Sequence, residues 1–211
     1  MVLNRIGGMK RFKEFLNEGH LHVYDVDETL FHTTAKVKVK HGDKEVASLS
    51  NSEYNDHKLP AGHHYDFSEF RSAHKFDTES KPVHRMLDHL KSTHTKAITT
   101  RNHKVILNTA RQDFDDKDRF LGTFKKHGVD IDNIHVHRAG NIATEKGLTV
   151  AHAKNEVIRR QLQSGKFHTV HLYDDNKTNL NHFLELKKEH PKVKFKAYHV
   201  KPDGTMKKHV E

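Results

Sequence analysis

The chain has 211 residues, which is enough for one α/β domain with a small insertion but short for two full domains. It contains no cysteine and only short apolar runs, which excludes a disulfide framework, a cysteine-ligated zinc site and a membrane span. The formal net charge of +9 suits an anionic partner such as nucleic acid or a phosphorylated small molecule, although the lysines are spread widely rather than gathered in one block.

The first 80 residues are predicted to contain a helix, a strand and then a small insertion. Apolar periodicity predicts a helix near 9–17, and the run "LHVYD" predicts a strand at 21–25. Residues 36–50 are typical of a hairpin that turns at 41–44. Residues 51–80 are polar, rich in turn formers and without a strong period, so we expect a small lid there.

The remainder of the chain alternates between strands and helices. Helices are expected at 82–93, 114–127, 151–163 and 178–188, and strands at 104–109, 134–138, 169–174 and 193–200. Pro82 is placed in the first turn of its helix, and Asp113 is the expected N-cap of the next helix. This alternation predicts the α/β class, with a Rossmann-like three-layer α/β/α arrangement around a mostly parallel sheet.

These elements divide the chain into four parts. We expect an N-terminal helix in 1–20, a core formed by 21–35 and 81–205, a hairpin flap or small cap at 36–80, and a tail at 206–211.

Polar side chains follow several of the predicted strands at the point where each strand ends. They are Asp25, Asp27, Thr109, Arg111, Arg138, Asp174 and Asp175. In an open α/β sheet, ligands bind beyond the carboxyl ends of the strands. Clustered carboxylates are suitable ligands for Mg²⁺, and arginine side chains neutralise phosphate. The sequence therefore predicts a site for a divalent cation and a phosphate.

Four segments, in this order, carry a family resemblance. The strand end "LHVYDVDET", the strand end "VILNT", a lysine near a helix start and the acidic pair in "VHLYDDN" together resemble the haloacid dehalogenase superfamily of phosphohydrolases. The resemblance covers roughly 20–200. Within that superfamily, "NTAR", a strand that ends in arginine and the double aspartate are similar to the phosphatase domain of phage polynucleotide kinase, although no kinase P-loop is present.

The resemblance implies a role for each matching residue. Asp25 would be the nucleophile that forms an aspartyl-phosphate, and Asp27 would be the general acid and then the general base. Thr109 would hydrogen-bond a phosphoryl oxygen. Lys154 is the preferred motif lysine, and Lys146 is the alternative.

The resemblance also implies a metal site and substrate contacts. Mg²⁺ would be held by Asp25, Asp27, Asp174 and Asp175, with Asn179 hydrogen-bonded to the acidic pair. Arg111 would contact the phosphate or the leaving group, unless it pairs with Asp113 or Asp116. For Arg138, substrate contact and structural pairing are equally supported. Glu28 is interpreted as an exposed acid, at a position where many relatives have glycine.

The function expected from these features is that of a Mg²⁺-dependent phosphomonoesterase acting on a nucleotide or a polynucleotide end. Tyr54, His63, His64 and Tyr65 of the lid are candidates for stacking on a base, or for packing within the lid. The alternatives are a nucleic-acid-binding protein with a degenerate fold of this type, and a phosphotransferase. We expect a cytoplasmic protein, and the resemblance implies that it is phage-encoded. The sequence predicts no oligomeric state.

Histidine is the other unusual feature of the composition. The 22 histidines are scattered and show no metal-binding spacing of the H-E-x-x-H kind. We therefore interpret nearly all of them as solvated or half-buried side chains.

Overall fold

A six-stranded sheet forms the centre of the protein. The computed structural model describes residues 19–100 and 102–210, and the helix expected near 9–17 lies outside these ranges. The strands are β1 (Gly19–Tyr24), β7 (His103–Thr109), β8 (His135–Arg138), β9 (Phe167–Asp174), β10 (Lys194–Val200) and β11 (Met206–His209). Their order is β11-β10-β9-β1-β7-β8, and only β11 runs antiparallel to its neighbour. The predicted mostly parallel sheet is confirmed.

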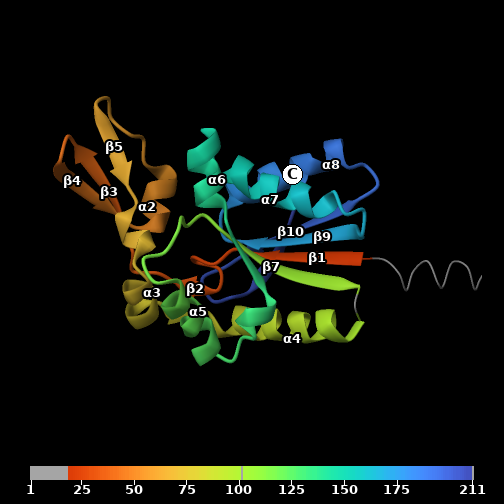
Figure 1. The fold of residues 1–211 in the computed structure, drawn as a ribbon. Coiled ribbons are helices and arrows are strands. Elements are labelled where there is room, and N and C mark those ends of the chain that lie inside the picture. The colour runs from red at the N-terminus through yellow and green to blue at the C-terminus, as the bar shows by residue number, and fades with distance from the viewer. Residues whose placement is uncertain (1–18, 101, 211) are drawn as a thin grey trace, which may run out of the picture.

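Helices cover both faces of this sheet (Figure 1). On one face lie α4 (His84–Thr100) and α5 (Lys117–Lys126), and on the other lie α6 (Ala139–Lys146), α7 (Val150–Leu162) and α8 (Lys177–Glu189). Alternate residues of β1 point to opposite faces, so that Val23 packs in the core under α7 and α8 while Tyr24 packs in the core under α4 and α5. None of the described helices is both long enough and apolar enough to cross a membrane.

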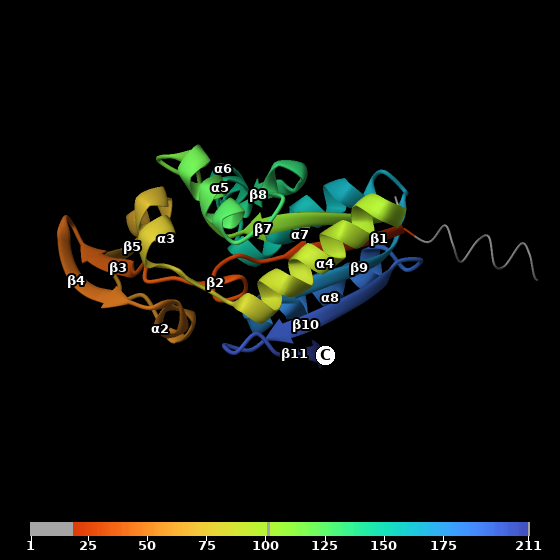
Figure 2. The same ribbon diagram turned by 90° about the horizontal axis from the view of Figure 1, so that it is seen from below.

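The flap expected at 36–80 contains more regular structure than its sequence predicted. The hairpin forms as β3 (Val37–His41) and β4 (Lys44–Leu49), and β5 (His63–Asp66) adds a third strand beside β3. The rest consists of α2 (Asn51–Asp56), the 3₁₀ helix η1 (Ser68–Arg71) and α3 (Ala73–Glu79). This unit extends from the end of the sheet at which β1 finishes (Figure 2).

Several predicted boundaries are wrong, for identifiable reasons. Pro82 does not lie in a helix, because the two-residue strand β6 (Lys81–Pro82) pairs with β2 (Phe31–His32) and α4 begins only at His84. Helix α5 begins at Lys117 and not at 114, because the side chain of Asp116, and not that of Asp113, accepts the hydrogen bond of the first turn. The run "ARQDFDD" offers more than one possible cap, and tertiary packing selects among them.

Three further elements were not expected. Helix α6 follows β8 directly, and a short 3₁₀ helix, η2 (Ile131–Asn133), precedes β8. The predicted tail at 206–211 contains β11, which follows a tight turn at Gly204 (φ 77°) and pairs with β10. Its four residues, "MKKH", lack the apolar alternation by which a strand is recognised in a sequence.

Candidate functional site

The loops that follow β1 and β9 lie side by side at one edge of the sheet. After β1, the next strands along the chain are added on one side of it, as β7 and β8, and the later ones on the other side, as β9 and β10. Such a reversal leaves a crevice at the carboxyl ends of the two central strands. The backbone N–H of Asp25 donates to the carbonyl of Tyr173 at 3.0 Å, so the chain after β1 stays next to Asp174 and Asp175.

A buried lysine links two of these carboxylates. Nζ of Lys154 lies 2.7 Å from Oδ1 of Asp25 and 2.7 Å from Oδ2 of Asp174, and all three side chains are at most 7 % exposed. Burial alone would lower the pKa of Lys154, but the carboxylates of Asp174 and Asp25 outweigh it and raise that pKa. Lys154 is therefore a permanent cation in the cluster.

Lys146, the alternative motif lysine, lies elsewhere. Its Nζ is 3.5 Å from Oε2 of Glu156, and its side chain is 48 % exposed. Lys154 reaches the carboxylates because α7 begins at Val150 with Thr149 as its N-cap, which places residue 154 one turn into the helix and facing β1. The structure thus brings Lys154, and not Lys146, to the acidic side chains.

Asp174 is further held by the chain that follows it. Its carboxylate accepts hydrogen bonds from the side-chain amide of Asn179 at 3.0 Å and from the backbone N–H of Asn176 at 2.9 Å. Asn176 in turn caps α8, with its side chain accepting from the backbone of Asn179. The predicted contact of Asn179 with the acidic pair is therefore present, and it orients Asp174 toward Lys154.

Three carboxylates share the single ammonium group of Lys154. Burial raises the pKa of Asp25 to about 7 and that of Asp175 to about 9, and in both cases the neighbouring Asp174 adds to the rise. One carboxylate oxygen from each of Asp25, Asp174 and Asp175 lies within 4.8 Å of the other two. Such closely placed, destabilised oxygens fit a hard divalent cation, which favours the ionised form of all three.

Asp27 is held separately, by Arg111. Nη2 of Arg111 lies 2.7 Å from Oδ1 of Asp27 and Nε lies 2.9 Å from Oδ2, so the contact is bidentate. The guanidinium also donates to the carbonyl of Phe70 at 2.7 Å, and its Cζ lies 4.7 Å from the ring centroid of Phe76. With a side chain only 1 % exposed, Arg111 fixes Asp27 and pairs with neither Asp113 nor Asp116.

Thr109 lies beneath the same loop. Its side chain is buried, and its Oγ1 accepts a hydrogen bond from the backbone N–H of Arg111 at 3.1 Å. The hydroxyl proton of Thr109 stays available to a second acceptor. The residue thus fixes the turn after β7 that places Arg111 beside Asp27.

The structure does not bring Arg138 to this site. Its Nη1 lies 3.0 Å from Oδ1 of Asp113, and it lines a separate, smaller pocket with Phe114 and Lys117. Of the two interpretations left open for Arg138, the structure therefore supports the structural ion pair.

Glu28 is not the exposed acid that the sequence predicted. It has φ 57° in the tight turn after Asp27, a conformation that costs most residues about 1–2 kcal/mol and glycine almost nothing. Its carboxylate accepts from the backbone N–H of Thr33 at 3.1 Å and contacts Nδ1 of His32 at 2.8 Å. These contacts offset the strain and close the loop that positions Asp27.

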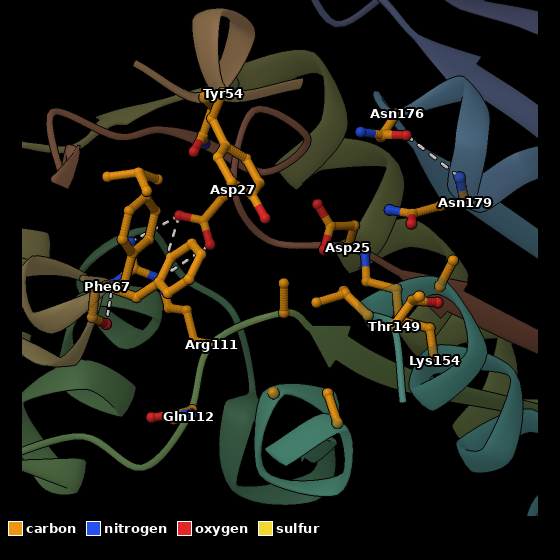
Figure 3. A pocket seen from close by; sticks show the side chains of 18 of the residues that line it. Asp25, Asp27, Tyr54, Phe67, Arg111, Gln112, Thr149, Lys154, Asn176 and Asn179 are labelled. Atoms are coloured by element: carbon orange, nitrogen blue, oxygen red, sulfur yellow. Dashed lines mark hydrogen bonds and ion pairs between the residues drawn. The ribbon is translucent and has the colours of Figure 1, made fainter. Parts of the chain in front are cut away.

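The carboxylates open into a cavity of about 830 Å³ between the core and the flap (Figure 3). The flap contributes an aromatic group of lining residues: Tyr54, His57, Tyr65, Phe67 and Phe70. Core residues at the mouth include Gln112, Thr149, Asn176, Thr178 and His182. Tyr54 and Tyr65 line the cavity and also pack within the flap against Ala35, Val37 and Phe70, so the structure is compatible with both interpretations of these residues.

Other parts of the cavity follow only from the tertiary structure. His63 and His64 are not among the lining residues. His57, Phe67 and Thr149 were missed, because nothing in their local sequence distinguishes them from residues that only pack or cap. The folding of the flap back over the strand ends identifies His57 and Phe67, and the position of the start of α7 identifies Thr149.

Fold and site together define an α/β protein with a buried carboxylate–lysine cluster at the switch point of a mostly parallel sheet. No protein-family model, curated protein or solved structure matches the chain. The functional argument therefore depends on the motifs and on the geometry of this site.

Proposed function

We propose that the protein is a Mg²⁺-dependent phosphomonoesterase of the haloacid dehalogenase type, acting on a nucleotide or a polynucleotide end. The observation that carries the proposal is the contact of one buried lysine, Lys154, with both Asp25 after β1 and Asp174 after β9. The order of the parallel strands, 3-2-1-4-5 in chain terms, supports it, because doubly wound sheets of this order bind phosphorylated ligands at that crevice.

The proposed reaction begins with an attack by Asp25. A carboxylate oxygen of Asp25 forms a bond to phosphorus, the bond from phosphorus to the leaving oxygen breaks, and Asp27 donates a proton to that oxygen. Asp27 then accepts a proton from a water molecule, whose oxygen attacks the aspartyl-phosphate and releases inorganic phosphate and the free carboxylate. Lys154 favours the ionised form of Asp25 and orients it for the first step.

Asp25, Asp174 and Asp175 are the residues that would hold Mg²⁺. When bound, this ion supplies positive charge that offsets both the carboxylates and the incoming phosphate. Since Asp174 already binds Lys154 and Asn179, we assign it to orienting Lys154, with Asp25 and Asp175 as the freer ligands.

The contact between Asp27 and Arg111 bears on the proton transfer. Both oxygens of Asp27 accept from Arg111, so one of them must exchange this contact for the leaving oxygen. Because Arg111 also binds the carbonyl of Phe70, the position of the flap is linked to that of the general acid. Arg111 is thus a positioning residue.

The aromatic side of the cavity supports a nucleotide or nucleic-acid substrate. Tyr54 packs edge-on against Tyr65 and Phe67, with ring centroids 4.9 and 5.5 Å apart, and Phe67 is 42 % exposed. Aromatic side chains of this kind stack on bases without strong sequence preference. The net charge of +9 is suited to a polyanionic substrate.

The test is phosphate release in the presence of Mg²⁺ from an aryl phosphate, nucleotides, sugar phosphates and 3′- or 5′-phosphorylated oligonucleotides. We expect Asp25→Asn to abolish turnover and Asp27→Asn to lower kcat about 10²–10⁴-fold. Asp113→Asn, which changes an acid outside the cavity, is the matched control and should retain activity. Full metal-dependent turnover by Asp25→Asn would contradict the covalent mechanism.

The same screen separates the alternatives. Salt-sensitive oligonucleotide binding without release of phosphate from any substrate would indicate a nucleic-acid-binding protein. Transfer of the phosphoryl group to an added alcohol or sugar, in preference to water, would indicate a phosphotransferase.

A further inference from the structure

A second cluster of titratable side chains lies on the α4 face of the sheet. His20 and His22 lie on β1, two residues apart and therefore on the same face, while Leu21 and Val23 between and beside them enter the opposite core. In the sheet register, His20 is paired with His103 of β7, and His22 with His171 of β9. Four imidazole rings from three adjacent strands thus form one array.

This array is separate from the carboxylate cluster. It lies toward the amino ends of the parallel strands, whereas Asp25 follows the carboxyl end of β1. At the usual strand rise of about 3.3 Å per residue, His22 and Asp25 are about 10 Å apart along the chain. The proposed phosphatase reaction uses none of these histidines.

The rings are closely packed and nearly parallel. The centroids of His20 and His103 are 4.6 Å apart at an interplanar angle of 10°, and those of His22 and His171 are 4.4 Å apart at 11°. Nε2 of His22 lies 3.1 Å from Nδ1 of His103. One ring nitrogen from each of His20, His22 and His103 lies within 4.8 Å of the other two.

These distances are close to those of a metal site. Zinc bound tetrahedrally by imidazole, with Zn–N bonds of about 2.0–2.1 Å, places its ligand nitrogens about 3.3 Å apart. The nitrogens of His22 and His103, now joined by a hydrogen bond, are already near that separation, and a ring nitrogen of His20 lies within 4.8 Å of both. The half-buried rings of His20 and His103 leave a path from the solvent.

The surroundings of the array favour the neutral form of its imidazole rings. His22 and His171 are each only 8 % exposed, and burial disfavours the charged form of an imidazole. Nδ1 of His171, a residue only 8 % exposed, is buried with no hydrogen-bond partner among the described residues. Neutral rings are the form that binds metal.

We propose that His20, His22 and His103 form a binding site for a divalent transition-metal ion of the Zn²⁺ type. Imidazole nitrogens suit Zn²⁺, Co²⁺, Ni²⁺ or Cu²⁺, whereas Mg²⁺ prefers the oxygen ligands of the carboxylate cluster. Lys96 and Lys196, which lie near the array, oppose an added cation and limit the affinity. Sequence motifs did not reveal the site, because its ligands come from two strands separated in the chain by the whole flap and α4.

The test is calorimetric titration of the full chain with Zn²⁺ in excess Mg²⁺. We expect one equivalent of Zn²⁺ to bind more tightly than any further equivalents. His103→Gln, which changes a half-buried residue at the start of β7, should weaken this tight binding at least about tenfold. His41→Gln is the matched control, because His41 and His63 in the flap form a close ring pair, 4.8 Å apart, on another sheet. Asp175→Asn should also leave the tight equivalent unchanged.

A measurement on the unmodified protein covers the case in which His103→Gln fails to fold. Co²⁺ in place of Zn²⁺ should give the visible absorption of a low-coordinate nitrogen site, and Zn²⁺-soaked crystals should show their strongest anomalous peak between β1 and β7. The proposal is wrong if His103→Gln keeps the tight equivalent, if Asp175→Asn removes it, or if the anomalous peak lies elsewhere.

Discussion

Replacing Lys154 by Met tests the charge balance of the carboxylate cluster most directly. Met retains much of the side-chain volume but removes the ammonium group that lies 2.7 Å from both Asp25 and Asp174. Both carboxylates are at most 7 % exposed, so water cannot replace the lost cation. Removing one partner of a buried ion pair typically costs about 3–5 kcal/mol of folding free energy.

Protonation sets an upper limit to this cost. A carboxyl left without its cation can take up a proton, which at pH 7 costs about 4 kcal/mol relative to a normal aspartate in the unfolded chain. At pH 5 the same limit is about 1.5 kcal/mol. A carboxyl whose pKa is raised by folding destabilises the fold least at low pH. Its cost in folding free energy grows as the pH rises. We therefore expect Lys154→Met to destabilise the fold by about 3–4 kcal/mol at pH 7 and by about 1.5 kcal/mol at pH 5.

Urea unfolding with EDTA at both pH values, for the wild type and the variant, measures this difference. Lys146→Met is the matched control, because it breaks only the exposed pair with Glu156, and we expect a change within about 0.5 kcal/mol. A loss below about 1 kcal/mol for Lys154→Met at pH 7, or an equal loss at the two pH values, would refute the reasoning.

Two further predictions concern backbone packing and acid stability. A Cβ on Gly140 would clash with the backbone carbonyl oxygen of Ala110 and lie 2.9 Å from that of Arg111. Gly140→Ala should therefore displace the segment that carries Arg111 and lower both the melting temperature and kcat. Gly122→Ala, with open space around it, should not lower them. Burial lowers the pKa of His137 to about 4, so the unfolded chain binds a proton that the fold rejects and stability falls as the pH drops from 6.5 toward 4. Because His137 is only partly buried, solvent screening keeps this loss below about 1 kcal/mol at pH 5.5. His137→Leu should remove it from the acid loss measured by urea unfolding. His135→Leu, which removes only the neighbouring charge that adds to the shift, should remove less of it, and equal acid losses in the two variants would count against the reasoning.

The sequence by itself determined the class of the fold and most of the acidic site. Alternating strands and helices require a parallel sheet with helices on both faces, since parallel strands need crossover connections. Because the carboxyl ends of such strands share one edge, the sequence placed Asp25, Asp174 and Asp175 at the same edge, and the pairing of β1 with β9 brought them together. Lys154 could be preferred over Lys146 because it lies early in the helix before β9.

Only the tertiary structure decided the partners of the long cationic side chains and the composition of the cavity. Arg111 binds Asp27 and Phe70, although the local sequence offered Asp113 and Asp116, and Arg138 binds Asp113. Such choices depend on how the flap and the loop after β7 pack, which sequence periodicity does not encode. The flap residues of the cavity, such as Phe67, follow from the same packing.

The histidine array shows the same limit in another form. His20 and His22 share a face because strands alternate, but the predicted strand began at residue 21, so the sequence did not place His20 beside His22. Their proximity to His103 and His171 required the order and register of β1, β7 and β9. Local periodicity determines which way a side chain points, whereas pairing between distant strands determines what it meets, and that pairing is a property of the whole fold.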